Sequence, residues 1–318
     1  MRVPTNRRTL LAATAATAAS TAAALLTGGT AHAAPDRART TGHTGTTGTT
    51  GHDDNAVSAR LRALEERHGA RLGVFAYDVR GRRAVRHRAG ERFPVCSLFK
   101  VLAAGAVLRD LDRHGEVLAR RVRWTAADVV SNSPVTGTEE HIENGLTVAE
   151  LCDAAICDSD NTAGNLLLRA LGGPDAVTRF ARSLGDRTTR LDRWEPDLNS
   201  AEPWRETDTT SPYAIARSYA RLVLGDALSP ADRDRLTSWM RATRTSGNRF
   251  RAGVPAGWTV ADKTGGGFYG ADNDAGVLWT PDGRPVVLAV LLTKPEQDAA
   301  YDHELIVKVV ESVVEAVG

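Results

Sequence analysis

The first run of periodic apolar positions predicts one helix and then two strands. Apolar residues recur at the spacing of one helix face after Asp54 or Asn55, either of which can cap a helix. Two segments rich in apolar residues follow, 72–79 and 83–87, with a glycine-containing turn between them. The positions on the helical face are Val57, Leu61 and Leu64.

Helical spacing dominates the middle of the chain, and strand patterns return near its end. Residues 97 to about 235 are mainly helical in pattern. Strands are then predicted at 258–263, 275–279 and 286–292. A last helix carries the apolar positions Leu305, Ile306, Val309, Val310, Val313 and Val317.

Strands at both ends of the chain with helices between them predict an α+β fold. One antiparallel five-stranded sheet would be built from both ends and flanked by the terminal helices. This sheet lobe would comprise residues 54–95 and about 236–318, and residues 96–235 would form an inserted all-helical lobe. A cleft between two lobes is a usual place for a functional site.

The chain begins with patterns typical of export. Arg7 and Arg8 precede an alanine-rich apolar stretch, and Ala31-His32-Ala33 then predicts cleavage of a signal peptide, residues 1–33. The arginine pair also resembles a twin-arginine signal, so two export routes stay open. Residues 34–53 are rich in Thr, Gly, Asp and His, which predicts a flexible leader. The mature protein is therefore expected to be secreted.

Charge and cysteine content narrow the classes of partner. The chain has 40 lysines and arginines against 39 aspartates and glutamates, which gives no reason to expect nucleic acid or an acidic membrane surface. Cys96, Cys152 and Cys157 fit no zinc-binding spacing. The last two lie five apart on one predicted helix and so face different ways. We expect three buried free thiols, no metal and no cofactor.

The first chemical pattern is Ser97-Leu98-Phe99-Lys100. Residues three apart at the start of a helix share a face, so Ser97 Oγ and Lys100 Nζ would meet. A lysine whose pKa is lowered by burial or by a nearby cation can take the serine proton. Backbone N–H groups at the helix start can stabilise an oxyanion. In isolation the same spacing fits a capping serine followed by a surface lysine.

The second pattern, Ser159-Asp160-Asn161, falls between two helical stretches. A connection there would face the cleft, where the Ser159 hydroxyl could relay a proton to a leaving nitrogen. The Asn161 amide could bind both a lysine and a substrate carbonyl. The alternative is a helix cap, for which all three residue types are favoured.

The third pattern, Lys263-Thr264-Gly265-Gly266, ends a predicted strand. Its glycines let a substrate approach the strand edge closely. Lys263 puts a cation where a substrate carboxylate could bind, and the Gly266 N–H could be a second oxyanion donor.

A fourth pattern lies in the polar stretch from Arg193 to Asp208, which predicts a long loop. Glu195 is a candidate general base there, and Asn199 could hold a water molecule beside it. The alternative is a solvated loop carboxylate.

Together, and in this chain order, the four patterns resemble those of the class A serine β-lactamases over residues 54–318. The resemblance implies a β-lactamase/transpeptidase-like fold and hydrolysis of the β-lactam amide bond of penicillins and cephalosporins, which confers antibiotic resistance. It implies a small-molecule substrate, no membrane contact after signal cleavage, and a monomer. It further implies an ion pair between Arg193 and Asp208 that holds the loop carrying Glu195.

The same resemblance implies a role for each site residue. Ser97 would be the acylated nucleophile, Lys100 a base or relay for acylation, and Ser159 the proton donor to the β-lactam nitrogen. Glu195 would activate the deacylating water, and whether Lys100 or Glu195 is the acylation base stays open. The N–H groups of Ser97 and Gly266 would form the oxyanion hole. The substrate would be held by Asn161, Asn199, Lys263, Thr264, Gly265, Gly266 and Arg249.

Several positions depart from the commonest family pattern. Asp272 lies near where many members carry a carboxylate-binding arginine, and Arg249 resembles the alternative arginine of other members. Asn132 occupies the place of an aromatic gate. Cys96 precedes the nucleophile as in some carbapenem-hydrolysing members, but Gly267 stands where their second cysteine would be, so that disulfide is not expected.

Two related classes share the first three patterns and remain as alternatives. A penicillin-sensitive D-Ala-D-Ala peptidase forms the same acyl-enzyme but does not need Glu195 with Asn199. A non-catalytic penicillin sensor stays acylated and is normally tethered to a membrane signalling segment. The glutamate and asparagine together favour a hydrolase.

Overall fold

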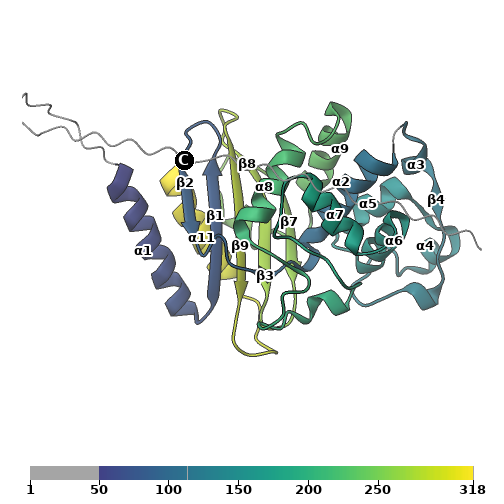
Figure 1. Ribbon diagram of the computed structural model, residues 1–318, viewed down its shortest axis with the longest axis horizontal. Helices are drawn as coiled ribbons and strands as arrows, with labels where there is room; N and C mark the ends of the chain where they lie inside the picture. The colour runs from purple at the N-terminus through teal and green to yellow at the C-terminus, as the bar shows by residue number, and fades with distance from the viewer. Residues whose placement is uncertain (1–49, 113, 318) are drawn as a thin grey trace, which may run out of the picture. The chain divides into compact units, whose positions relative to one another are not determined.

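The computed structural model describes residues 50–112 and 114–317. Its centre is an antiparallel five-stranded sheet built from both ends of the chain, as predicted (Figure 1). The N-terminal strand β1 pairs along its length with the C-terminal strand β9, with Arg71 opposite Thr293. In spatial order the strands are β2 (Ala84–His87), β1 (Arg71–Asp78), β9 (Pro285–Thr293), β8 (Asp272–Trp279) and β7 (Thr259–Gly266).

Helices cover both faces of this sheet. The first and last helices, α1 (Thr50–His68) and α11 (His303–Val317), pack together on one face (Figure 1). The short α10 (Phe250–Gly253) contacts α11. On the other face, α8 (Pro212–Val223) contacts β1, β8 and β9, and α9 (Pro230–Arg241) contacts β7.

The remaining elements form the helical lobe beside β7 (Figure 1). Its helices are η1 (Cys96–Leu98), α2 (Phe99–Ala106), η2 (Val107–Leu111), α3 (Glu116–Ala119), η3 (Ala126–Asp128), α4 (Glu139–Asn144), α5 (Val148–Cys157), α6 (Asn161–Leu171), α7 (Asp175–Ser183) and η4 (Asp197–Ser200). Two short strand pairs join these elements: β3 (Phe93–Pro94) with β6 (Thr209–Thr210), and β4 (Arg121–Val122) with β5 (Leu146–Thr147).

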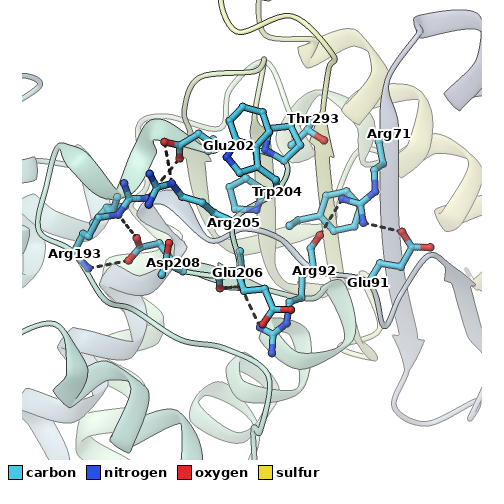
Figure 2. Close-up of a pocket in the computed structure, with 17 residues that line it drawn as sticks. Arg71, Glu91, Arg92, Arg193, Glu202, Trp204, Arg205, Glu206, Asp208 and Thr293 are labelled. Carbon is cyan, nitrogen blue, oxygen red and sulfur yellow. Dashed lines mark hydrogen bonds and ion pairs between the residues drawn. The ribbon is translucent and has the colours of Figure 1, made fainter.

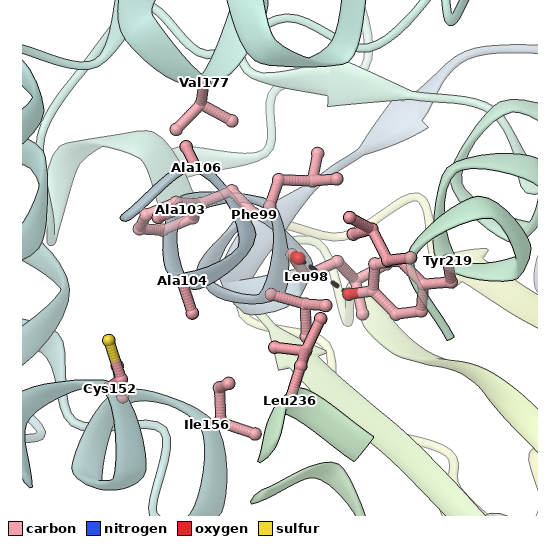
Figure 3. Close-up of a cluster of buried hydrophobic side chains, with 14 of the residues drawn as sticks. Leu98, Phe99, Ala103, Ala104, Ala106, Cys152, Ile156, Val177, Tyr219 and Leu236 are labelled. Atoms are coloured by element: carbon pink, nitrogen blue, oxygen red, sulfur yellow. Dashed lines mark hydrogen bonds between the residues drawn. The ribbon is translucent and has the colours of Figure 1, made fainter. Parts of the chain in front are cut away.

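The helix α2 is buried on every side, and this fixes the turn that precedes it. All of its residues are buried, which is typical of a helix that is apolar all round. Side chains from α5, α7, α8 and α9 surround it, among them Cys152, Val177 and Leu236 (Figure 3). Tyr219 Oη donates a 2.7 Å hydrogen bond to the carbonyl of Leu98 and so anchors the beginning of the helix. The turn before α2 therefore has little freedom to move.

The first helix begins earlier than its sequence pattern indicates. It starts at Thr50, so residues 50–53, which were assigned to the leader, are helical. Asp54 and Asn55 lie inside the helix and do not cap it. The apolar spacing that predicts this helix starts only at Val57, so the pattern carries no signal for the preceding turn. The predicted signal peptide and the leader up to residue 49 lie outside the described residues.

The boundary of the helical lobe also differs from the prediction. The predicted lobe runs to about residue 235, but α8 packs against the sheet, so the inserted lobe ends before Pro212. Apolar periodicity shows that one face of a helix is buried and does not show which element covers it.

Within the described part of the chain, no helix combines the length and the apolar character that a membrane span requires.

The three cysteines are free and buried in the structure. Cys152 faces α2 (Figure 3), whereas Cys157 Sγ donates to the carbonyl of Trp239. Burial raises the pKa of the Cys157 thiol to about 12, so the native thiol is a poor nucleophile. We expect thiol titration of the denatured, non-reduced mature protein to find three reactive cysteines and the native protein to react slowly. A count of one after denaturation would show that a disulfide forms in solution.

Candidate active site

Ser97 lies in the 3-10 turn η1, directly before α2, and Lys100 lies in the first turn of α2. The two side chains meet as predicted, because Lys100 Nζ donates a 3.0 Å hydrogen bond to Ser97 Oγ. Cys96, just before the serine, has a left-handed φ of +44°. Such a conformation costs energy in a non-glycine residue and is often found at functional sites.

The side chain of Lys100 is completely buried, and its ammonium group contacts several potential proton acceptors. It donates hydrogen bonds to the Ser159 carbonyl at 2.8 Å and to Asn161 Oδ1 at 2.7 Å. Glu195 Oε1 forms an ion pair with it at 3.1 Å. Burial lowers the pKa of Lys100, and the negative charge of Glu195 opposes that shift. A buried lysine in this state can exchange a proton with the serine beside it.

The Ser159-Asp160-Asn161 triplet connects α5 to α6. Asp160 is the helix cap that the alternative interpretation expects, since its side chain accepts from the Ala163 N–H at 2.8 Å. Ser159 has a left-handed φ of +58° and Asn161 begins α6. Because Asp160 alone satisfies the cap, the hydroxyl of Ser159 and the amide of Asn161 are free to face the cleft.

The strand β7 brings Lys263 to the same cluster. Its Nζ donates to Ser159 Oγ at 2.9 Å and to the Thr264 carbonyl at 2.8 Å. Burial and the positive charge of Lys100 lower the pKa of Lys263 to about 7. A Cβ placed on Gly265 would lie 3.3 Å from the Ser97 backbone nitrogen, so the end of this strand runs directly beside the serine. Gly266, the next residue, ends the strand.

The loop between α7 and β6 carries Glu195 into the cleft. Asn165 of α6 holds the Glu195 backbone on both sides, donating to its carbonyl and accepting from its N–H at 3.0 Å each. Asn199 Nδ2 donates to Glu195 Oε2 at 2.5 Å. Asn165 belongs to none of the four sequence patterns. It lies one turn after the Ser159 triplet, and only the folded chain brings it against the loop.

An ion pair also holds the two ends of the polar stretch of this loop, Arg193 and Asp208, together. Arg193 Nε contacts Asp208 Oδ2 at 2.6 Å, the pair that the family resemblance implies (Figure 2). Asp208 Oδ1 also accepts from the backbone N–H of Arg193 at 3.0 Å. Behind the loop lies a second cavity of about 480 Å³, in which Arg71 and Glu91 also pair (Figure 2). This cavity includes none of the four predicted catalytic side chains, so it belongs to the support of the loop.

A further cluster lies beyond β7, around Arg249. Its Nε pairs with Asp272 Oδ1 at 2.8 Å, and its Nη1 donates to the Thr245 carbonyl at 2.7 Å. The other oxygen of Asp272 contacts His303 Nδ1 at 2.7 Å. Asp272 is fully buried and does not line the cleft, so it acts as an anchor for Arg249. Sequence comparison alone gave Asp272 no role.

One open cleft of about 830 Å³ lies over these clusters, and the side chains of Lys100, Glu195 and Lys263 are buried beneath its lining. Asn132 lies at its edge and donates to the Ser159 carbonyl at 3.2 Å. Cys96 Sγ would lie 3.1 Å from a Cβ on Gly267, so Gly267 does occupy the place opposite this cysteine.

Among the residues that the structure describes, no three His, Cys, Asp or Glu side chains gather as a metal site. The predicted residues in the cleft lining are Ser97, Ser159, Asn161, Asn199, Arg249, Thr264, Gly265 and Gly266.

Comparisons with known proteins agree with this geometry. The model of the "Beta-lactamase enzyme family" matches residues 56–317. A β-lactamase of Streptomyces fradiae is 58% identical over 290 residues, covering 91% of this chain and 90% of the relative. The solved structure of the β-lactamase from Streptomyces albus G superposes with a TM-score of 0.82 at 59% identity, covering 83% of this chain and all of the other.

A reconstructed ancestral class A β-lactamase of Gram-negative bacteria, in an engineered variant, is also similar. Its structure superposes with a TM-score of 0.78 at 51% identity, covering 82% of this chain and 98% of the other. At these identities and coverages both fold and family are shared. The chain therefore belongs to the β-lactamase enzyme family, as a class A member.

Proposed function

We propose that this protein hydrolyses the β-lactam amide bond through an acyl-enzyme on Ser97. The observation that carries the proposal is the contact of Lys100 Nζ with both Ser97 Oγ and Glu195 Oε1, at 3.0 and 3.1 Å. A proton can leave the serine along this path as its oxygen attacks the carbonyl carbon. Either Lys100 or Glu195 can be the final acceptor, and both remain candidates for the acylation base.

The next step breaks the carbon–nitrogen bond of the ring. The N–H groups of Ser97 and Gly266 would stabilise the oxyanion that forms first. When the bond breaks, the ring nitrogen needs a proton, and the hydroxyl of Ser159, which lines the cleft, can supply it. The contact with Lys263 at 2.9 Å supports this role, because the lysine can replace the proton that Ser159 gives away.

Deacylation would use a water molecule activated by Glu195. Two buried acceptors support this: Asn199 Oδ1 has no hydrogen-bond donor among the described residues, and the ion-pair contact of Glu195 Oε1 with Lys100 Nζ, at 3.1 Å, leaves that carboxylate oxygen without a further donor. Buried acceptors are normally paired, and one water could donate to both. A glutamate that already holds Asn199 through its other oxygen is fixed in orientation, which suits a general base.

The substrate carboxylate would bind on the other side of the serine. Lys263, Thr264 and Arg249 provide two cations and a hydroxyl there, and an anion beside two cations gains charge-assisted hydrogen bonds. Asn161 would contact the substrate side chain, and Gly265 leaves room for the substrate against the strand edge. Penicillins and cephalosporins, which carry this carboxylate, are therefore the proposed substrates.

A steady-state assay tests the function directly. We expect purified mature protein to hydrolyse a chromogenic cephalosporin and a penicillin with many turnovers. A D-Ala-D-Ala peptide serves as the matched substrate for the peptidase alternative. Turnover of the peptide alone, or a single stoichiometric reaction with penicillin, would replace this proposal by the peptidase or the sensor.

The proposed carboxylate-binding group of Lys263, Thr264 and Arg249 leads to a separate prediction. Arg249→Ala should raise KM for carboxylate-bearing substrates by about tenfold or more, because a hydrogen bond to a charged group contributes about 1.5–3 kcal/mol. Asp272→Ala should raise KM less, since Arg249 keeps its bond to the Thr245 carbonyl. Michaelis–Menten curves measure KM for both variants. Equal, small increases in KM would show that Arg249 does not bind the substrate carboxylate.

We also propose that the mature protein is secreted as a monomer after cleavage following Ala33. The small-x-small triplet and the apolar stretch before it support this. Mass spectrometry of the protein from culture medium should find Ala34 at its N-terminus, and light scattering should give the mass of a single chain.

A further inference from the structure

Tyr301 is a cleft residue that none of the four sequence patterns includes. It lies between β9 and α11, two residues before His303. Its side chain lines the same cleft as Ser97, Thr264 and Arg249. About half of the residue is exposed, at 49%. Its ring rests on His303 at 5.8 Å between ring centres.

The hydroxyl of Tyr301 stands over the end of β7. A Cβ built on Gly266 would lie only 2.8 Å from Tyr301 Oη, so no larger residue fits there without displacing the ring. A Cβ on Gly265 would instead approach Cys96 and the Ser97 nitrogen. Because successive strand residues point to opposite faces, Gly266 shares its face with Thr264. Tyr301 Oη therefore lies on the Thr264 side of the strand.

This hydroxyl has no hydrogen-bond partner among the described residues. Tyr301 makes no hydrogen bond to any residue in the ranges 50–112 and 114–317, whereas Thr264 Oγ1 is 2.6 Å from Thr245 Oγ1. Partial burial raises the pKa of Tyr301, so the phenol keeps its proton at neutral pH. The cleft that Arg249 lines thus contains a neutral donor to which no described residue is hydrogen-bonded.

We infer that Tyr301 is a further substrate-binding residue, whose hydroxyl donates a hydrogen bond to the substrate carboxylate next to Thr264 and Arg249. The inference rests on the proposed β-lactam hydrolysis. Gly266 has no side chain, so space remains above the end of β7. Tyr301, from the segment between β9 and α11, places its hydroxyl in that space. A carboxylate bound by Arg249 has lone pairs left to accept such a bond. The phenol would then contribute to substrate binding more than to the bond-breaking step.

The test compares a charged substrate with its neutral form. Benzylpenicillin and its methyl ester differ only in the carboxylate, and Tyr301→Phe removes only the hydroxyl. We expect Tyr301→Phe to lower kcat/KM for the acid about tenfold, mainly through KM, and to leave the ester within about twofold. Tyr213→Phe is the matched control, since Tyr213 is a similarly exposed phenol that packs on Phe75 and does not line the cleft.

The outcomes distinguish a failure of the proposed role of Tyr301 from a failure of the proposed β-lactam hydrolysis. An unchanged kcat/KM for the acid, or equal losses for acid and ester, would overturn the role of Tyr301 while wild-type turnover upholds the proposed function. A wild type that does not turn over benzylpenicillin overturns both. As a second measurement, Kd for the acid on the inactive Ser97→Ala background should weaken about tenfold when Tyr301→Phe is added.

Discussion

Replacing Ser97 with alanine is expected to abolish β-lactam turnover while the fold survives. No other group in the described residues stands where Ser97 Oγ does, beside Lys100 and the end of β7. Loss of a serine nucleophile costs hydrolases roughly a millionfold in kcat. Stability should change little, because Lys100 keeps its contacts with Ser159, Asn161 and Glu195. Only one hydrogen bond is lost.

Intact-mass spectrometry with a slow substrate locates the chemistry. Wild type should gain one substrate mass, and peptide mapping should place it on Ser97. Ser131→Ala is the matched control, because Ser131 lines the same cleft without contacting Lys100. It should keep activity within a few-fold and still form the adduct. An adduct on another residue, or turnover by Ser97→Ala, would contradict the assignment.

The parts of the site that lie close together in sequence were predictable. Ser97 and Lys100 meet because three residues span less than one helical turn, so their spacing determines the contact. The Ser159 triplet and Lys263 could be placed at a helix junction and a strand end for similar local reasons. That Lys263 reaches Ser159 across 104 positions follows from the family resemblance and not from spacing.

Contacts between distant residues could not be derived in this way. Asp272 lies near where many family members carry a carboxylate-binding arginine, and only the folded chain shows it as a buried anchor for Arg249. Asn165 and Tyr301 carry no local pattern, because Asn165 binds a loop 30 positions away and Tyr301 lies over the end of β7, which only the folded chain brings near it. The packing partner of a helix could not be predicted for the same reason. Apolar periodicity in α8 indicates that one face is buried, but it does not show that the sheet covers that face.

Glu195→Ala is expected to separate acylation from deacylation. Without the base and the orientation it gives a water, deacylation should fall by about 10²–10⁴-fold or more. Acylation can continue, because the negative charge of Glu195 opposes the lowered pKa of Lys100. Removing that charge lowers the pKa of Lys100 further and increases its neutral form, which can accept the Ser97 proton. The variant should therefore accumulate as a stable acyl-enzyme.

A time course of intact mass after mixing with penicillin measures both halves of the reaction. Wild type should return quickly to free enzyme, Glu195→Ala should stay acylated, and Asn199→Ala should show a smaller delay because Glu195 remains. The rate at which Glu195→Ala gains mass also identifies the acylation base: a rate near wild type favours Lys100, and a large loss favours Glu195. Glu195→Gln keeps the side-chain volume and serves as the control for packing, so it should stall in the same way. If wild type itself stays acylated for many minutes and Glu195→Ala changes nothing, Glu195 is a loop carboxylate without a catalytic role, and the peptidase or sensor describes this protein better.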